Sequence, residues 1–145
     1  MSKTVEKAIT INAPVEKVFA YISDPANLPE IWPSLVEVKA VKQLPEGVGS
    51  TYRWVYKMAG MKFEGTSETK EYVTNERLVI KDKGGIESTR TTLFKPKDDG
   101  MEYTTLVEYT IPIPLVGKLA EAFIVKQNEN EADVFLSNLK AMMEA

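Results

Sequence analysis

The sequence predicts one α+β domain over residues 1–145, in which a seven-stranded antiparallel sheet is combined with two short helices after the first strand and a long C-terminal helix. A chain of 145 residues is long enough for a single hydrophobic core and too short for two. Alternating polar and apolar residues fill most of 35–110, and the very short turns between these runs join antiparallel neighbours. Helical patterns that begin beside prolines flank this region on both sides.

The first strand and the two short helices are predicted before this main β region. Polar and apolar residues alternate over 3–11, which is typical of a strand with one buried face. Pro14 suits the first turn of a helix, because the N–H that proline lacks would have no partner there. Asp24, again followed by proline, predicts an N-capped short helix that runs toward Trp32.

Six more strands are predicted between residues 35 and 110. The segments that separate them are rich in glycine, proline, asparagine and aspartate, which favour tight turns. These turns are Pro45-Glu46-Gly47, Ala59-Gly60, Thr74-Asn75, Lys83-Gly84-Gly85 and Asp98-Asp99-Gly100.

A long helix is predicted over residues 115–143, and its apolar residues change sides near the middle. The polar segment 126–131 lies at this change of side. Three interpretations remain open: the helix breaks there, its two halves pack on different partners, or the segment is a solvated stretch of a surface helix. The stripe of the first half consists of Leu115, Val116, Leu119, Ala122 and Phe123.

Composition excludes several kinds of chemistry. The chain has no cysteine and no histidine, so it has no disulfide, thiolate nucleophile, Ser-His-Asp triad or ordinary zinc site. Its 18 basic and 21 acidic residues give a net charge of −3, which offers no attraction to nucleic acid. No apolar run is long enough for a secretory signal or a membrane span, so we expect a cytoplasmic protein without stable membrane insertion, and no cofactor.

The inner face of each strand is predicted by asking which face keeps charged groups in water. The strand at 86–95 is ambiguous: one face carries Arg90 and the other carries Glu87, and we place Arg90 inside. The resulting interior is rich in tyrosine, tryptophan, serine and threonine, which need hydrogen-bond partners when buried. Either a ligand-binding cavity or a packed core with internal partners accounts for this pattern. The other inward residues include Tyr52, Trp54, Tyr56, Met58, Met61, Phe63, Ser67, Tyr103 and Tyr109.

The chain resembles the START-like, or SRPBCC, superfamily over essentially its whole length. The opening of that superfamily is similar to Ile9-x-Ile11-x-Ala13-Pro14-x-Glu16-x-Val18-Phe19-x-x-Ile22-x-Asp24-Pro25-x-Asn27-x-x-x-x-Trp32. The segment from Glu71-Tyr72 to Arg77-Leu78 and the ending Phe135-Leu136-x-Asn138-Leu139-Lys140 resemble its later landmarks. The most similar branches are the polyketide cyclase/dehydrase-like proteins and those that resemble the G-subunit of carbon monoxide dehydrogenase.

This resemblance implies the helix-grip fold of the birch pollen allergens, a curved sheet that clasps the long helix around a cavity. Members of the superfamily bind lipids, sterols, polyketides, quinones or hormones, and a minority catalyse cyclisation or dehydration. We therefore expect a carrier or sensor of a small hydrophobic or amphipathic molecule. The alternatives are a cyclase or dehydratase and an interaction module that resembles co-chaperone activators. Catalysis is the weaker alternative, because histidine is absent and the ordinary pKa values of tyrosine and arginine lie far from neutral.

The residues expected to contact the ligand lie on the predicted inner faces of the sheet, on the long helix and near the end of the second short helix. They are Trp32, Tyr52, Trp54, Tyr56, Phe63, Arg90, Tyr103, Tyr109, Leu119 and Phe123.

Overall fold

A computed structural model describes residues 2–58, 60–111 and 117–145 of the chain and confirms the predicted α+β architecture. The elements follow one another as β1 (Ser2–Ile11), α1 (Val15–Ile22), the 3-10 helix η1 (Pro25–Asn27), α2 (Leu28–Ile31), β2 (Leu35–Lys42), β3 (Thr51–Met58), β4 (Met61–Val73), β5 (Arg77–Gly84), β6 (Glu87–Lys97), β7 (Gly100–Thr110), the 3-10 helix η2 (Lys118–Ala120) and α4 (Glu121–Glu144).

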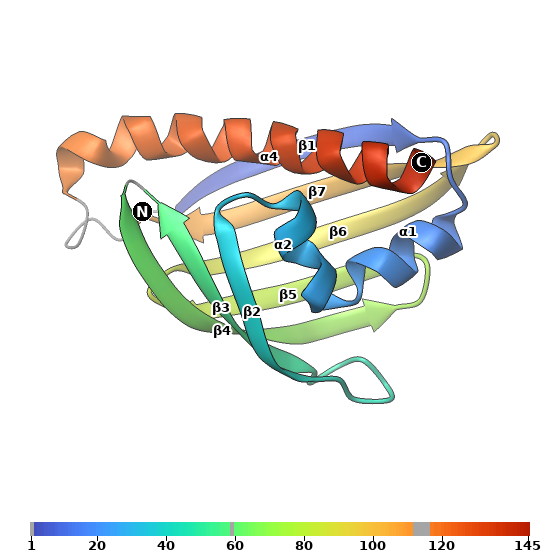
Figure 1. Cartoon of the computed structure of the whole chain (residues 1–145), viewed down its shortest axis with the longest axis horizontal. Coiled ribbons are helices and arrows are strands. Elements are labelled where there is room, and N and C mark those ends of the chain that lie inside the picture. Colours follow the sequence, from blue (N-terminus) through green and yellow to red (C-terminus); the bar gives the residue numbers. More distant parts are fainter. Residues whose placement is uncertain (1, 59, 112–116) are drawn as a thin grey trace.

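The strands form one antiparallel sheet in the order β1-β7-β6-β5-β4-β3-β2, so β1 and β2 are its edges. The sheet curves strongly, and α4 extends along its open side next to β1 (Figure 1). Register shifts interrupt the pairing of β2 with β3 and of β4 with β5. Such irregularities bend strands locally, and here they accompany the curvature of the sheet.

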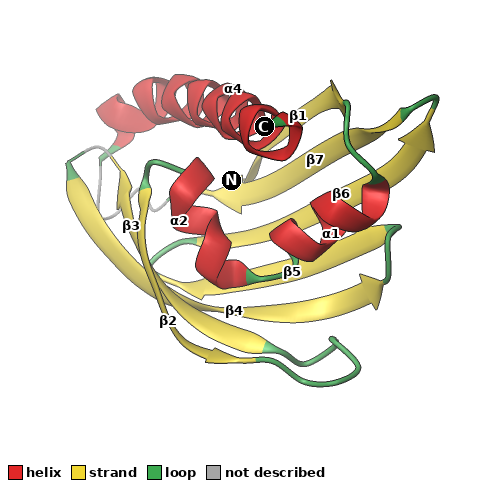
Figure 2. Cartoon of the chain, turned by 45° about the vertical axis from the view of Figure 1, so that its right-hand side comes forward, coloured by secondary structure: helices red, strands yellow, loops and turns green. Residues whose placement is uncertain are grey.

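Two helices cover the interior in Figure 2: α2 contacts β2, and α1 contacts β6. Pro14 begins the first short helix as expected, but as the N-cap residue of α1, one position before the first turn in which the sequence places it. The Asp24 carboxylate accepts a hydrogen bond from the Ala26 backbone N–H at 3.1 Å, which caps η1. The Phe19 ring on α1 packs edge-on against Phe94 of β6, with centroids 5.0 Å apart. The Phe19 contact joins α1 to the core, and the Asp24 bond fixes the start of η1.

Residues 121–144 of the long helix are continuously helical, so of the three interpretations left open for 126–131 the break is excluded. The predicted apolar stripe of its first half is wrong, because Phe123 is 57% exposed whereas Ile124 is fully buried. The predicted residues 115 and 116 lie outside the described residues. A single inward stripe at helical spacing runs along α4 and consists of Ile124, Asn128, Glu131, Ala132, Phe135, Leu136, Leu139 and Met143.

The C-terminal end of α4 is fixed to the start of the chain by charged side chains. Lys17 Nζ donates a hydrogen bond to the Met143 carbonyl at 2.8 Å, and Lys140 Nζ donates one to the Thr10 carbonyl at 2.8 Å. The Glu144 carboxylate accepts one from the Asn12 backbone N–H, and this bond lowers the pKa of Glu144. These bonds hold one end of the helix over the sheet.

None of the helices in the described part of the chain has the length and apolar character needed to cross a membrane.

Candidate functional site

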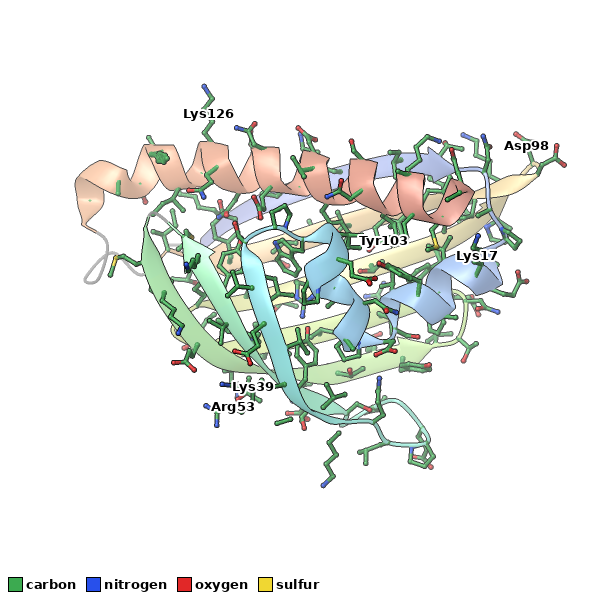
Figure 3. The ribbon with its side chains drawn as sticks, viewed as in Figure 1. Lys17, Lys39, Arg53, Asp98, Tyr103 and Lys126 are labelled. Carbon is green, nitrogen blue, oxygen red and sulfur yellow. The ribbon has the colours of Figure 1, made fainter. Side chains whose placement is uncertain are left out.

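A cavity of about 140 Å³ lies between the concave face of the sheet and α4, and it is partly open to solvent. It is lined by strands β1, β2, β3, β5, β6 and β7, by helices α1, α2 and α4, and by Trp32 and Ile86 between these elements. Figure 3 shows Tyr103 in this interior, whereas Lys39, Arg53 and Lys126 point away from it. A dry apolar cavity of about this size is known to hold benzene, so there is room for a small organic molecule or several waters.

The structure brings seven of the ten predicted ligand-contacting residues together around the cavity. They are Trp32, Tyr52, Trp54, Tyr56, Arg90, Tyr103 and Tyr109. Phe63 is buried but packs in the core outside the cavity lining. Phe123 points to solvent, because α4 begins at Glu121 and this phase turns Ile124 inward. The side chain of Leu119 lies outside the described part of the structure.

The inward choice of Arg90 over Glu87 is confirmed, since Ser88, Arg90 and Thr92 line the cavity from β6 and Glu87 is exposed. The cavity also contains polar residues that the sequence analysis did not select. Asp82 comes from β5, where it shares a face with Leu78 and Ile80. Asn128 and Glu131 come from the polar segment of α4, which therefore lines the cavity in part and is not merely a solvated surface stretch.

An ion pair between Asp82 and Arg90 forms the polar end of the cavity. Arg90 Nε lies 2.8 Å from one carboxylate oxygen, and Arg90 Nη2 lies 3.0 Å from the other, so the pair is bidentate. Ser88 Oγ donates to the same carboxylate at 2.5 Å, and the buried Ser67 hydroxyl donates as well. The two charged side chains are only 12% and 9% exposed, so this pair is held in a largely desolvated place.

The environment of Arg90 keeps it charged. Burial alone lowers the pKa of Arg90, but the charge of Asp82 and the hydrogen bonds to Asp82 and Tyr52 outweigh burial and raise this pKa above its ordinary value. The guanidinium also lies over the Trp32 ring, 5.3 Å from its centroid, in a cation–π contact. Arg90 is thus a fixed cation with a fixed counter-ion.

The hydroxyl of Tyr52 is oriented by Arg90. Nη2 of Arg90 donates a hydrogen bond to the Tyr52 oxygen. Because that oxygen is the acceptor, the Tyr52 proton points elsewhere, and no described side chain or backbone group accepts it. Tyr52 therefore presents a hydrogen-bond donor beside the ion pair.

Three buried side-chain atoms have no hydrogen-bond partner within the described residues: Trp54 Nε1, Tyr109 Oη and Gln127 Oε1. The Trp54 indole lies across β4 at Gly65, where an added Cβ would come well under 3.0 Å from the ring and from the Lys83 carbonyl. An unpartnered buried polar group costs about 1–3 kcal/mol. The side chains of Trp54 and Tyr109 line the cavity, but their unpartnered atoms expose almost no surface to it.

The other tyrosines of the cavity remain neutral over the physiological range. Burial, with a smaller effect of the Glu131 charge, raises the pKa of Tyr56 to about 12. Burial also raises the pKa of Tyr103, and it raises that of Tyr109 with Glu129 adding to the increase. The Asn128 side chain partly offsets this rise in the pKa of Tyr109, although it forms no hydrogen bond with the Tyr109 hydroxyl. These hydroxyls are donors and acceptors of hydrogen bonds, not bases.

Two polar contacts connect α4 to the end of α2 and to the segment that follows it. The Glu131 carboxylate accepts a hydrogen bond from the Ser34 backbone N–H at 2.6 Å, and Asn138 Nδ2 donates one to the Ile31 carbonyl at 3.1 Å. Between them, the Trp32 ring packs edge-on against Phe135, with centroids 5.8 Å apart. Trp32 therefore forms part of the wall between sheet and helix.

Comparison with protein families provides the identification. Residues 2–144 match the family model described as "Polyketide cyclase / dehydrase and lipid transport". The chain belongs to this family. No curated protein matches the sequence. The family assignment bears out the resemblance noted in the sequence and leaves the ligand unspecified.

Solved structures similar to this family member share its fold. A protein from Thermus thermophilus is 24% identical, with a TM-score of 0.75 over 96% of this chain and 95% of that one. The Zhui aromatase/cyclase from Streptomyces sp. R1128 is 16% identical, with a TM-score of 0.79 over 99% and 94% of the two chains. Ara h 8.0201 is 13% identical, with a TM-score of 0.68 over 99% and 98%. At these identities the likeness shows the helix-grip fold alone.

Proposed function

We propose that this protein binds one small hydrophobic or amphipathic molecule, such as a lipid, polyketide or quinone, in the cavity between sheet and α4 and acts as its carrier or sensor. The observation that carries the proposal is a cavity of about 140 Å³ whose lining is mostly apolar, with the polar groups of Tyr52, Asp82 and Arg90 gathered at one end. Apolar contacts supply affinity in such sites, and a few polar groups fix the orientation. Membership of a family described by lipid transport supports this proposal.

A neutral fluorescent probe, N-phenyl-1-naphthylamine, tests this proposal. Its emission rises in apolar surroundings, and it has no carbonyl or charge, so its binding depends mainly on the apolar part of the cavity. Ala132 lines the cavity from α4, and Ala132→Trp fills part of that space. Val134, two residues along the same helix, is 42% exposed, so Val134→Trp is the matched control.

We expect saturable binding of one probe molecule by the natural chain and by Val134→Trp, and binding at least about tenfold weaker by Ala132→Trp. Circular dichroism of each variant checks that it is folded. Equal binding by both tryptophan variants, or no binding by the natural chain, contradicts the proposal.

A cyclase or dehydratase is the second candidate, favoured by one specific observation. The Tyr52 proton is directed away from Arg90 and lies beside a fixed cation, an arrangement that can polarise a substrate carbonyl. The Glu131 carboxylate also lines the cavity and is a candidate base. Turnover of an aromatic polyketide mimic that disappears in Tyr52→Phe supports this candidate. Absence of turnover by the natural chain, with the mimic bound, contradicts it.

A further inference from the structure

The carboxylate at the polar end of the cavity has no acceptor capacity left. One oxygen of Asp82 accepts hydrogen bonds from Ser67 and Arg90, and the other accepts from Ser88 and Arg90. An ionised carboxylate has about four lone-pair sites, so four hydrogen bonds saturate it. A ligand therefore cannot use Asp82 as an acceptor without displacing a protein donor.

The donors next to this carboxylate are only partly used. Nε and Nη2 of Arg90 donate to Asp82 and Tyr52, whereas Nη1 donates to none of the residues that the structure describes. The Tyr52 proton is likewise directed away from its neighbour. Two donor groups thus remain for a molecule in the cavity, and their natural complement is a hydrogen-bond acceptor such as a carbonyl oxygen.

The charges around the cavity decide between a neutral and an ionic acceptor. Its described charged lining consists of Arg90, Asp82 and Glu131, one positive and two negative groups. An anionic ligand would lose its hydration and find a cation that already has a counter-ion at 2.8 Å. A cationic ligand would meet Arg90 at the same end. An uncharged acceptor has the smallest cost of desolvation and still satisfies the free donors.

We propose that the ligand of this cavity is an uncharged molecule with a carbonyl-type acceptor, such as a ketone, ester or quinone, and that Asp82 is a specificity-determining residue because it neutralises Arg90. This inference rests on the proposed function. It narrows the ligand class by excluding carboxylates, phosphates and amines. It also assigns to Asp82 a role that does not require a hydrogen bond to the ligand, because protein donors already occupy its acceptor sites.

Three probes of one shape test the inference: 2-acetylnaphthalene, 2-naphthoate and 2-naphthylmethylammonium, titrated by isothermal calorimetry near neutral pH. The natural chain should bind the ketone at least about tenfold more tightly than either ion, because only the ions must be desolvated without a free counter-charge. Tighter binding of naphthoate or of the ammonium overturns the inference while leaving cavity binding in place. If none of the three probes binds and N-phenyl-1-naphthylamine does not bind either, the proposed function itself is contradicted.

The variant Asp82→Asn tests the role assigned to Asp82. It keeps the size of the side chain but frees the charge of Arg90, so the preference for ketone over naphthoate should fall by about tenfold or reverse. Asp133→Asn is the matched control, since Asp133 lies on the exposed side of α4 and its loss changes the net charge equally. An unchanged ratio in folded Asp82→Asn overturns the role of Asp82. The selectivity of the natural chain remains decisive even if Asp82→Asn does not fold.

Discussion

Removal of the Asp82 side chain should be among the most destabilising single changes in this protein. Asp82→Ala leaves the charge of Arg90 without its counter-ion in a place where the arginine side chain is 12% exposed. Loss of one partner of a buried ion pair costs about 3–5 kcal/mol of the free energy of unfolding. The adjacent cavity admits water to Arg90, which favours the lower end of this range, but the buried Ser67 hydroxyl also loses its acceptor. We therefore expect a loss of about 3–4 kcal/mol.

A double variant separates the stranded charge from the lost packing. In Asp82→Ala with Arg90→Met, no unpaired charge remains and a flexible apolar side chain occupies the place of the arginine. The double variant should therefore be more stable than Asp82→Ala alone, by about 2 kcal/mol. Urea denaturation followed by circular dichroism measures both values.

The exposed pair of Glu71 and Arg77 is the matched control for this experiment. Its atoms are 3.1 Å apart, close to the distances within the buried pair, but its side chains are 52% and 42% exposed. Glu71→Ala should cost less than about 1 kcal/mol, because water and salt screen exposed charges. The reasoning is refuted if Asp82→Ala costs no more than Glu71→Ala, or if the double variant is less stable than Asp82→Ala.

Three further predictions concern the packing and the titration of the interior. Gly65→Ala should cost about 3 kcal/mol or more in urea denaturation, because its Cβ would meet the Lys83 carbonyl and the Trp54 ring; a neutral effect would contradict this close packing. Leu139→Ala should cost about 2–5 kcal/mol, since Leu139 is fully buried on the inner side of α4, and a loss below about 1 kcal/mol would disprove its place in the core. The free energy of unfolding should fall as the pH rises from about 10 to about 12, because folded Tyr56 keeps a proton that the unfolded chain releases; ionisation of every tyrosine near pH 10 in the folded protein would contradict this.

Local rules were sufficient to predict the fold class. The strands alternate, the turns are short, and Pro14 and Asp24 begin the two short helices as expected. The same rules did not show which residues of α4 face the interior. Counting Phe123 as an inward residue placed the two halves of the helix on opposite sides, whereas the true stripe starts at Ile124 and passes through polar residues. A polar residue facing a cavity cannot be told from one facing solvent by periodicity alone.

Strand alternation predicts most residues of the candidate site, but it misses Asp82, whose burial depends on an ion pair with a residue of the next strand. Tyr52 and Trp54 follow from the parity of β3, whereas Arg90 depended on a choice between two faces of β6 that both carry charge. Asp82 shares the inward parity of Ile80, but a rule that keeps carboxylates in water does not select it. Its burial is made possible by Arg90 on the next strand, and that proximity depends on the register that pairs Ile80 with Arg90. The alternation of residues along each strand does not reveal how β5 and β6 are aligned with each other.

The most direct test of ligand binding in the cavity is a measurement of intermolecular nuclear Overhauser effects between 2-acetylnaphthalene and the protein in solution. The account predicts contacts from the acetyl methyl group to the ring protons of Tyr52, and from the naphthalene ring to the indole protons of Trp54, both of which line the cavity. Contacts confined to exposed side chains such as Phe123, with none to Tyr52 or Trp54, would contradict it.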